Sequence, residues 1–186
     1  MNDFVVVTGG PGSGKSTLID LLETRGYARS QEAGRGVIRD QVEIGGTALP
    51  WQDRRLFAEL MLSWELRSYR LAAAAGTTVL FDRGVPDVIG YLRVEGLPVP
   101  EHVHRAAREF RYRDEVFIAP PWPEIYAWDA ERKQSLDEAE RTYHAMVEAY
   151  TECGYDLVAL PRVSVRERAD FVTGALRKTS ESSGLR

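Results

Sequence analysis

Short apolar runs alternate with longer stretches of mixed character along the 186 residues of this chain. The first run, over residues 4–7, is continuous and mostly valine, a pattern typical of a strand that is buried on both faces. Comparable runs predict four further strands, at residues 27–31, 77–81, 115–119 and 155–160.

Between these runs, apolar residues recur every three or four positions, which is the period of helices that cover a sheet. In the longest such stretch, Leu56, Leu60, Trp64 and Leu71 follow this period, and Gly76 ends it. The predicted helices begin with the segment that contains 17–22 and continue with 33–44, 51–75, 86–94, 102–110, 135–153 and 165–176.

The alternation of strands and helices predicts an α/β fold with three layers. Strands joined through helices form crossover connections, so the sheet of about five strands should be mainly parallel, with helices on both faces. We predict one domain over residues 1–178 and a flexible polar tail over 179–186. Ligands of such sheets bind beyond the carboxyl ends of the strands, and functional residues are therefore expected there.

Composition narrows the possible partners. A net charge of −4 and a pI near 5.5 argue against a nucleic-acid partner or an anionic membrane surface. The lone Cys153 excludes an intramolecular disulfide and a cysteine-rich metal site. The first strand leaves no room for a signal peptide, and no apolar run reaches membrane-spanning length, so we expect a cytoplasmic protein.

The segment after the first strand matches the P-loop pattern G-x-x-x-x-G-K-S/T, in the order strand, glycine-rich loop and helix that this pattern requires. Glycines allow successive N–H groups to point inward at phosphate oxygens, and the helix that follows favours an anion at its N-terminus. The predicted nucleotide-binding residues are Gly9, Gly10, Pro11, Gly12, Ser13, Gly14, Lys15, Ser16 and Thr17.

Two residues of this loop have separate roles in the prediction. Lys15 should lie against the β- and γ-phosphates, and the Ser16 hydroxyl should ligate Mg²⁺. The alternative interpretation is a glycine turn before an ordinary helix. The chain lacks the Asn/Thr-Lys-x-Asp motif that reads guanine in GTPases, which favours ATP over GTP.

A carboxylate follows a second buried strand. Asp82 comes directly after the run at 79–81, where an acid can approach Mg²⁺ directly or through water, the role of a Walker B aspartate. We therefore predict that Ser16 and Asp82 hold the magnesium ion. A plain strand-ending turn is the alternative, because Asp and Gly are common turn formers.

With these motifs the chain resembles the nucleoside and nucleotide kinase branch of the P-loop proteins. Asp82-Arg83-Gly84 looks like the Asp-Arg-aromatic motif of thymidylate kinases and the Glu-Arg-Ser motif of deoxynucleoside kinases. Residues 81–87, with segments 120–126 and 129–132, are more similar to a small AAA-like ATPase/kinase domain family that includes the bacterial nicotinamide-riboside kinase domain. Gly84 departs from the first two motifs, so their substrate contacts do not transfer.

The resemblance implies roles for further residues. An acid after the second strand binds the acceptor hydroxyl in such kinases, and Glu32 occupies that place, with Arg35 one helical turn later. A lid near 122–135 would bring Arg132, and with it Lys133, over the phosphates. Arg83 would contact the donor phosphate or the acceptor. The alternatives are a helix-start acid for Glu32, a solvated loop for Arg132 and a structural ion pair for Arg83.

Weaker candidates surround the acceptor side. Trp51, Trp64 and Arg67 could line an acceptor pocket, although Trp64 lies on an apolar face and fits the core equally well. Residues 161–164 follow the last strand, where related kinases hold the purine base. Arg141 is a further lid candidate.

The predicted function is ATP- and Mg²⁺-dependent transfer of a phosphoryl group to a small acceptor that resembles a nucleoside or nucleotide. Lys15, Glu32, Asp82, Arg83 and Arg132 form the predicted catalytic set. Two alternatives remain: a nucleotide-binding switch that hydrolyses slowly and reports to a protein partner, and a kinase of a larger target such as a sugar nucleotide. The pattern of residues predicts neither the acceptor nor the oligomeric state.

Overall fold

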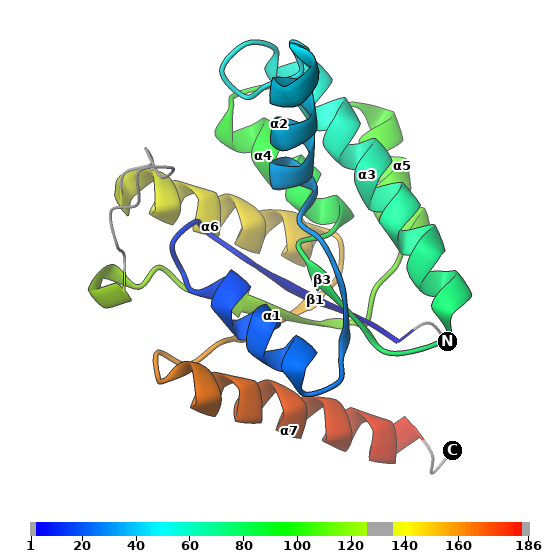
Figure 1. Ribbon diagram of the computed structural model, residues 1–186, viewed down its shortest axis with the longest axis vertical. Helices are drawn as coiled ribbons and strands as arrows, with labels where there is room; N and C mark the ends of the chain where they lie inside the picture. Colours follow the sequence, from blue (N-terminus) through cyan, green and yellow to red (C-terminus); the bar gives the residue numbers. More distant parts are fainter. Residues whose placement is uncertain (1–2, 126–135, 184–186) are drawn as a thin grey trace.

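The computed structural model describes residues 3–125 and 136–183, and its centre is a parallel sheet of five strands in the order β2-β3-β1-β4-β5 (Figure 1). The predicted α/β fold, its parallel sheet and the approximate positions of all five strands are confirmed. The strands are β1 (Phe4–Gly9), β2 (Ala28–Ser30), β3 (Val79–Asp82), β4 (Glu115–Ala119) and β5 (Asp156–Ala159).

Every predicted helix is present, with small shifts of the ends. The helices are α1 (Lys15–Thr24), α2 (Ala33–Ile44), α3 (Arg54–Ala75), α4 (Val85–Val94), α5 (Glu101–Glu109), the 3-10 turn η1 (Pro123–Ile125), α6 (Leu136–Glu152) and α7 (Val165–Ser183).

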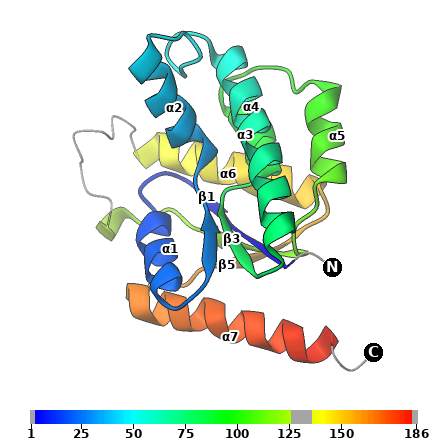
Figure 2. The same cartoon turned by 45° about the vertical axis from the view of Figure 1, so that its right-hand side comes forward.

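The helices form a layer on each face of the sheet. α1 and α7 lie together on one face, and α3, α4, α5 and α6 cover the other, with α2 packed beside α3 (Figures 1 and 2). The strand β1 contributes to both layers: Phe4 and Val6 join the larger apolar cluster, whereas Val5 and Val7 join the cluster under α1 and α7. This double burial explains why its sequence is apolar without alternation.

Two helix ends differ from the prediction. α3 begins at Arg54 rather than 51, because the Asp53 carboxylate caps it by accepting a hydrogen bond from the Leu56 N–H at 2.9 Å. α7 continues to Ser183, beyond the predicted helix end at 176. The polar sequence there lacks the apolar period that would have predicted a helix.

The topology places the predicted functional segments at one edge. β1 is the central strand, and β3 pairs with it so that Asp82 lies opposite Val7. β2 ends beside β3, with Ser30 opposite Phe81. The segments that follow β1, β2 and β3 therefore meet at the carboxyl edge of the sheet. In the part of the chain that the structure describes, no helix is long and apolar enough to cross a membrane.

Candidate active site

The P-loop connects β1 to α1 and is tightly enclosed. Gly9 has a φ of +127°, and a Cβ atom there would lie 2.4 Å from the carbonyl oxygen of Ala119 at the end of β4. A Cβ atom on Gly10 would lie 2.5 Å from the carbonyl oxygen of Ala139 in α6. Both positions need glycine because neighbouring backbone comes too close for any side chain. The backbone at the end of β4 and at the start of α6 therefore packs directly against the first two glycines of the loop.

Lys15 lies folded over this loop. Its Nζ donates a hydrogen bond to the carbonyl oxygen of Gly10 at 2.7 Å and another to Ser13 Oγ at 3.3 Å. The residue is 7% exposed, and burial, together with the positive charge of Arg83, lowers the pKa of its ammonium to about 8. A bound phosphate would supply the counter-ion that this buried cation needs.

Asp82 ends β3 with an unsatisfied acceptor. Its Oδ1 is buried and has no hydrogen-bond partner. Burial and the neighbouring charge of Glu32 raise the pKa of this carboxyl, against the opposing effect of Lys15 and Arg83. An orphaned carboxylate oxygen beside a phosphate-binding loop fits a hard cation such as Mg²⁺.

The neighbourhood of Asp82 constrains how a metal ion would bind. Across residues 3–125 and 136–183, no three His, Cys, Asp or Glu side chains gather into a set that could hold a metal ion. A magnesium ion here would use the Asp82 carboxylate, the Ser16 hydroxyl, nucleotide phosphates and water. Such a mixed set is typical of magnesium in nucleotide sites.

Arg83 adopts an unusual backbone conformation directly after β3. Its φ of 76° makes it the one residue other than glycine with positive φ in the described part of the chain. Its N–H donates to the carbonyl oxygen of Val7 at 3.1 Å, which anchors the turn to β1. Positive φ in a residue with a long side chain is strained, and such strain is common at functional sites.

The Arg83 guanidinium bridges two carboxylates. Nε lies 3.0 Å from Glu32 Oε1, and Nη1 lies 3.0 Å from Asp87 Oδ1. Burial alone would lower the pKa of this guanidinium, but Glu32, Asp87 and Asp82 raise it, so Arg83 stays charged. Arg83 therefore forms the ion pairs that the alternative interpretation expected. Its contact with a substrate stays a prediction.

Glu32 precedes α2 and turns toward the site rather than toward its own helix. Its side chain makes no capping hydrogen bond to α2, which disfavours the interpretation of a plain helix-start acid. Oε1 binds Arg83 and Oε2 binds Arg35 Nε at 3.0 Å. Burial would raise the pKa of Glu32, but Arg83, Lys15 and Arg35 together lower it, so the carboxylate is ionised at neutral pH.

Two buried acids at the site were not predicted. The Asp87 carboxylate accepts four hydrogen bonds. The donors are Thr8 Oγ1 at 2.6 Å, Tyr150 OH at 2.6 Å, the Gly84 N–H at 2.9 Å and Arg83 Nη1 at 3.0 Å. Asp87 lies three residues after Gly84, which caps the N-terminus of α4. This is a capping position, which the sequence could have indicated. Asp87 thereby fixes Arg83 to β1, α4 and α6 together.

Glu65 is the second of these acids. It is 3% exposed on α3, and burial, with the negative charges of Asp87 and Asp82, raises its pKa well above the usual value. The sequence could have indicated this acid, because Glu65 lies on the same face of α3 as the apolar residues Met61 and Leu62. Glu65 is therefore a buried carboxyl group close to Asp87 and Asp82.

Other candidates lie elsewhere. Trp51 is 62% exposed, and Trp64 packs against the larger apolar cluster and closely against Gly36. Trp64 and Arg67 line a cavity of about 650 Å³ along the outer edge of β2, which contains none of the predicted catalytic residues. Arg141 is exposed on α6. The lid residues Arg132 and Lys133 lie outside the described residues.

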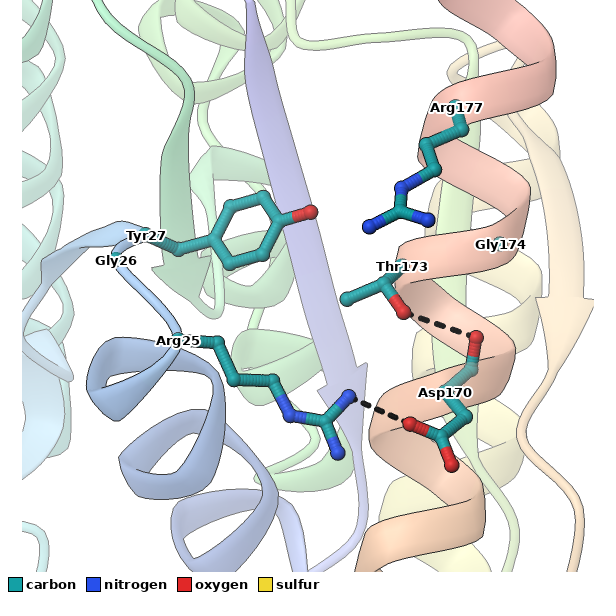
Figure 3. A pocket seen from close by; sticks show the side chains of 7 residues that line it. All are labelled: Arg25, Gly26, Tyr27, Asp170, Thr173, Gly174 and Arg177. Atoms are coloured by element: carbon teal, nitrogen blue, oxygen red, sulfur yellow. Dashed lines mark hydrogen bonds and ion pairs between the residues drawn. The ribbon is translucent and has the colours of Figure 1, made fainter.

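A second hollow lies far from the P-loop. Its volume is about 600 Å³. Figure 3 shows its lining residues, which come from the end of α1 and from α7. Arg25 Nη1 binds Asp170 Oδ1 at 2.7 Å across it. None of its lining residues belongs to the loop or the carboxylate cluster. The candidate site is therefore the charged cluster at the carboxyl edge of the sheet and not one of the two hollows.

The fold has counterparts among known proteins. A family model described as an AAA domain matches residues 4–168, whereas comparison with curated proteins gave no match. Among solved structures, a deoxyadenosine kinase from M. mycoides with the products dCMP and a flexible dCDP bound has a TM-score of 0.67 at 14% identity, over 94% of this chain and 99% of that one. A thymidylate kinase from Ehrlichia chaffeensis has a TM-score of 0.65 at 13% identity, over 95% and 98%. The predicted nucleotide-kinase type of fold is confirmed.

Proposed function

Because this chain belongs to the family described as an AAA domain, within the P-loop proteins of nucleotide-kinase type, we propose that it is an ATP-dependent phosphotransferase. The acceptor is a small molecule that resembles a nucleoside or nucleotide, and Mg²⁺ accompanies the ATP. The observation that carries the proposal is the convergence of Lys15, Glu32 and Arg83 beside the unsatisfied carboxylate oxygen of Asp82.

The donor side of the reaction follows from the P-loop. Its N–H groups and Lys15 bind the β- and γ-phosphates, and the buried ammonium gains a counter-ion in doing so. Magnesium, when bound, neutralises phosphate charge as the transferred group leaves. Ser16 and Asp82 would hold this ion, and the burial of the unpaired Asp82 Oδ1 would strengthen its attraction to the metal.

The acceptor side depends on Glu32 and Arg83. The Glu32 carboxylate is ionised and each of its oxygens retains a further lone pair, so it can accept a hydrogen bond from an acceptor hydroxyl. As the acceptor oxygen bonds to the γ-phosphorus, the bond from that phosphorus to the β,γ-bridging oxygen breaks and ADP leaves, while the hydroxyl proton passes to the Glu32 carboxylate. Arg83 holds Glu32 in place and adds positive charge beside the transferred group. Arg132 is proposed to complete this charge from the lid segment.

The switch hypothesis explains less of the site. A protein that only binds and slowly hydrolyses ATP needs the P-loop and Asp82, but not a half-buried carboxylate held by two arginines after β2. Glu32 has that environment through Arg83 and Arg35. The kinase solved with dCMP and dCDP supports an acceptor of nucleotide type over a larger target.

The test is ADP formation from Mg-ATP by the purified protein, with and without a panel of nucleosides and nucleotides, and with Lys15→Ala as the blank. One acceptor should stimulate turnover strongly. Glu32→Gln should lower the stimulated rate by about 10²- to 10⁴-fold. Glu43→Gln, an exposed change on the same helix, should leave it intact. Slow turnover that neither the acceptors nor Glu32→Gln alter would favour the switch.

A further inference from the structure

An arginine that the proposed reaction does not use lies directly behind the P-loop. Arg168 belongs to the first turn of α7, which packs beside α1 on the same face of the sheet (Figure 2). Its side chain is buried, at 3% exposure. Ala169 and Val172 belong to the apolar cluster under this helix, so the backbone that carries Arg168 is firmly placed.

The charge of Arg168 has no acidic partner in the part of the chain that the structure describes. Burial lowers the pKa of its guanidinium, and no nearby carboxylate acts in the opposite direction. Its Nε is buried without a hydrogen-bond partner. A buried cation without a counter-ion destabilises a fold. Within residues 3–125 and 136–183 no carboxylate therefore balances the charge of this guanidinium, and a ligand that brings negative charge would do so.

The Arg168 guanidinium donates a hydrogen bond to the P-loop. Arg168 Nη1 donates to the carbonyl oxygen of Ser13 at 3.0 Å, across 155 positions of sequence. The Ser13–Gly14 peptide is trans, because no described peptide bond is cis. In a trans peptide the C=O and the next N–H point in opposite directions. With the Ser13 carbonyl turned out toward α7, the Gly14 N–H is turned inward, as a phosphate-binding loop requires.

The surroundings of Gly14 hold the guanidinium in this position. Gly14 has a φ of 76°, and a Cβ atom there would lie 2.8 Å from Arg168 Nη1 and 3.1 Å from Ile125 Cδ1. The Arg168 guanidinium also lies over the Trp122 ring, with Cζ 5.7 Å from the ring centroid. The segment 122–125 and α7 thus enclose the outer side of the loop, and the arginine fills the space between them.

We propose that Arg168 is a positioning residue for phosphate binding, which holds the Ser13–Gly14 peptide with its N–H toward the phosphates and balances their charge from behind the loop. The inference rests on the proposed use of ATP. It does not depend on transfer to an acceptor.

The experiment compares ATP binding by the wild-type protein, Arg168→Met and Arg168→Lys, with Arg166→Met as the control. Arg166 is exposed on the same turn, so its replacement removes the same charge without touching the loop. Calorimetry should show a Kd for ATP about tenfold higher in Arg168→Met, the size expected for a lost hydrogen bond to a charged group. Arg168→Lys keeps the charge and should fall between this variant and the wild type, and Arg166→Met should match the wild type.

The steady-state constants separate positioning from folding. A positioning residue raises the KM for ATP and leaves the KM of the acceptor unchanged, whereas partial unfolding lowers kcat and leaves both KM values alone. The Tm without nucleotide should equal or exceed that of the wild type. An unchanged Kd for ATP in Arg168→Met, or a fall in kcat alone, overturns the inference. If the wild type binds ATP but phosphorylates no acceptor, the proposed function fails while the Kd comparison still decides the role of Arg168.

Discussion

Arg83 and Glu32 bind each other across the carboxyl ends of neighbouring strands, with Nε and Oε1 3.0 Å apart. Arg83 follows β3 and Glu32 follows β2, so this ion pair joins two loops that are 51 positions apart in sequence. Because Arg83 also binds Asp87, removal of its guanidinium would leave two partly or fully buried carboxylates without their main counter-ion.

The first prediction is a coupling between these two residues. Arg83→Met should lower the free energy of unfolding by about 3–5 kcal/mol, the usual effect of breaking a buried ion pair. Glu32→Gln in the Arg83→Met background should recover part of this loss, because one unpaired carboxylate is removed. Urea unfolding of the two single variants and the double variant measures the coupling.

Arg39→Met is the control for this cycle, since Arg39 pairs with Asp40 at 66% side-chain exposure. Its effect should stay within about 0.5 kcal/mol, and it should add to that of Glu32→Gln without coupling. Strict additivity of Arg83→Met and Glu32→Gln would contradict the account.

The lowered pKa of Glu32 also means that its stabilisation is present above its usual pKa of 4.5 and is lost as the pH falls through the lower folded value.

The second prediction concerns the pH dependence of ATP binding. The pKa of Lys15 is lowered from 10.5 to about 8 in the free protein, and phosphate needs the protonated form. The Kd for ATP should therefore be constant below pH 8 and rise by about tenfold by pH 9. Titration calorimetry between pH 6.5 and pH 9.5 would measure this, and a flat profile across the range would argue against Lys15 as the phosphate ligand.

The same shift predicts a gain in stability when Lys15 is removed. A lysine whose folded pKa is lowered binds fewer protons in the native state, so stability rises with pH between about 8 and 10.5. At pH 7 the burial of its charge costs about 3 kcal/mol. Lys15→Met should unfold at a higher temperature than the wild type at pH 7 and lose this advantage near pH 10. Its weak ATP binding should show no pH step.

The third prediction concerns magnesium. Asp82→Asn keeps the size of the side chain and removes its charge, so the Mg²⁺ concentration for half-maximal activity should rise by about tenfold or more, equivalent to 1.4 kcal/mol or more. The Tm without nucleotide should not fall, because burial already disfavours the carboxylate. Asp40→Asn, an exposed change on α2, is the matched control. A lower kcat with an unchanged Mg²⁺ requirement would place Asp82 outside the metal site.

The fourth prediction compares two glycines. Gly10→Ala would put a Cβ atom 2.5 Å from the Ala139 carbonyl oxygen, so it should lower the free energy of unfolding by about 1–3 kcal/mol and weaken ATP binding. Gly174→Ala meets nothing within 4 Å in the interior of α7 and should stabilise by about 0.5–1 kcal/mol. Thermal unfolding of both variants would check the pair, and destabilisation by Gly174→Ala would contradict the packing described for α7.

The sequence could predict the features whose cause is local. The P-loop is a contiguous motif, β1 is a continuous apolar run and α2 shows a helical period, so their places could be read directly. Asp82 was recognised because it follows a strand immediately. The far end of α7 was missed because polar residues carry no helical period there.

Features that depend on distant partners could not be read in this way. Asp87 binds Thr8 across 79 positions, and Arg168 binds Ser13 across 155. Each of these side chains looks like an ordinary surface charge in its own segment, and only the sheet order brings it to the loop. Glu32 was predicted through the resemblance to kinases, but its pairing with Arg83 and Arg35 follows from the register of β2 beside β3.

The most direct test of the account is the fate of the γ-phosphate. ATP labelled at this position is incubated with Mg²⁺, the wild-type protein and the acceptor panel, and labelled acceptor is separated from free phosphate. Most of the label should appear on one nucleoside or nucleotide, Glu32→Gln should lower the rate of its formation by about 10²- to 10⁴-fold, and Glu43→Gln should retain it. Label that appears only as inorganic phosphate, at the same slow rate with every acceptor and in Glu32→Gln, would contradict the account.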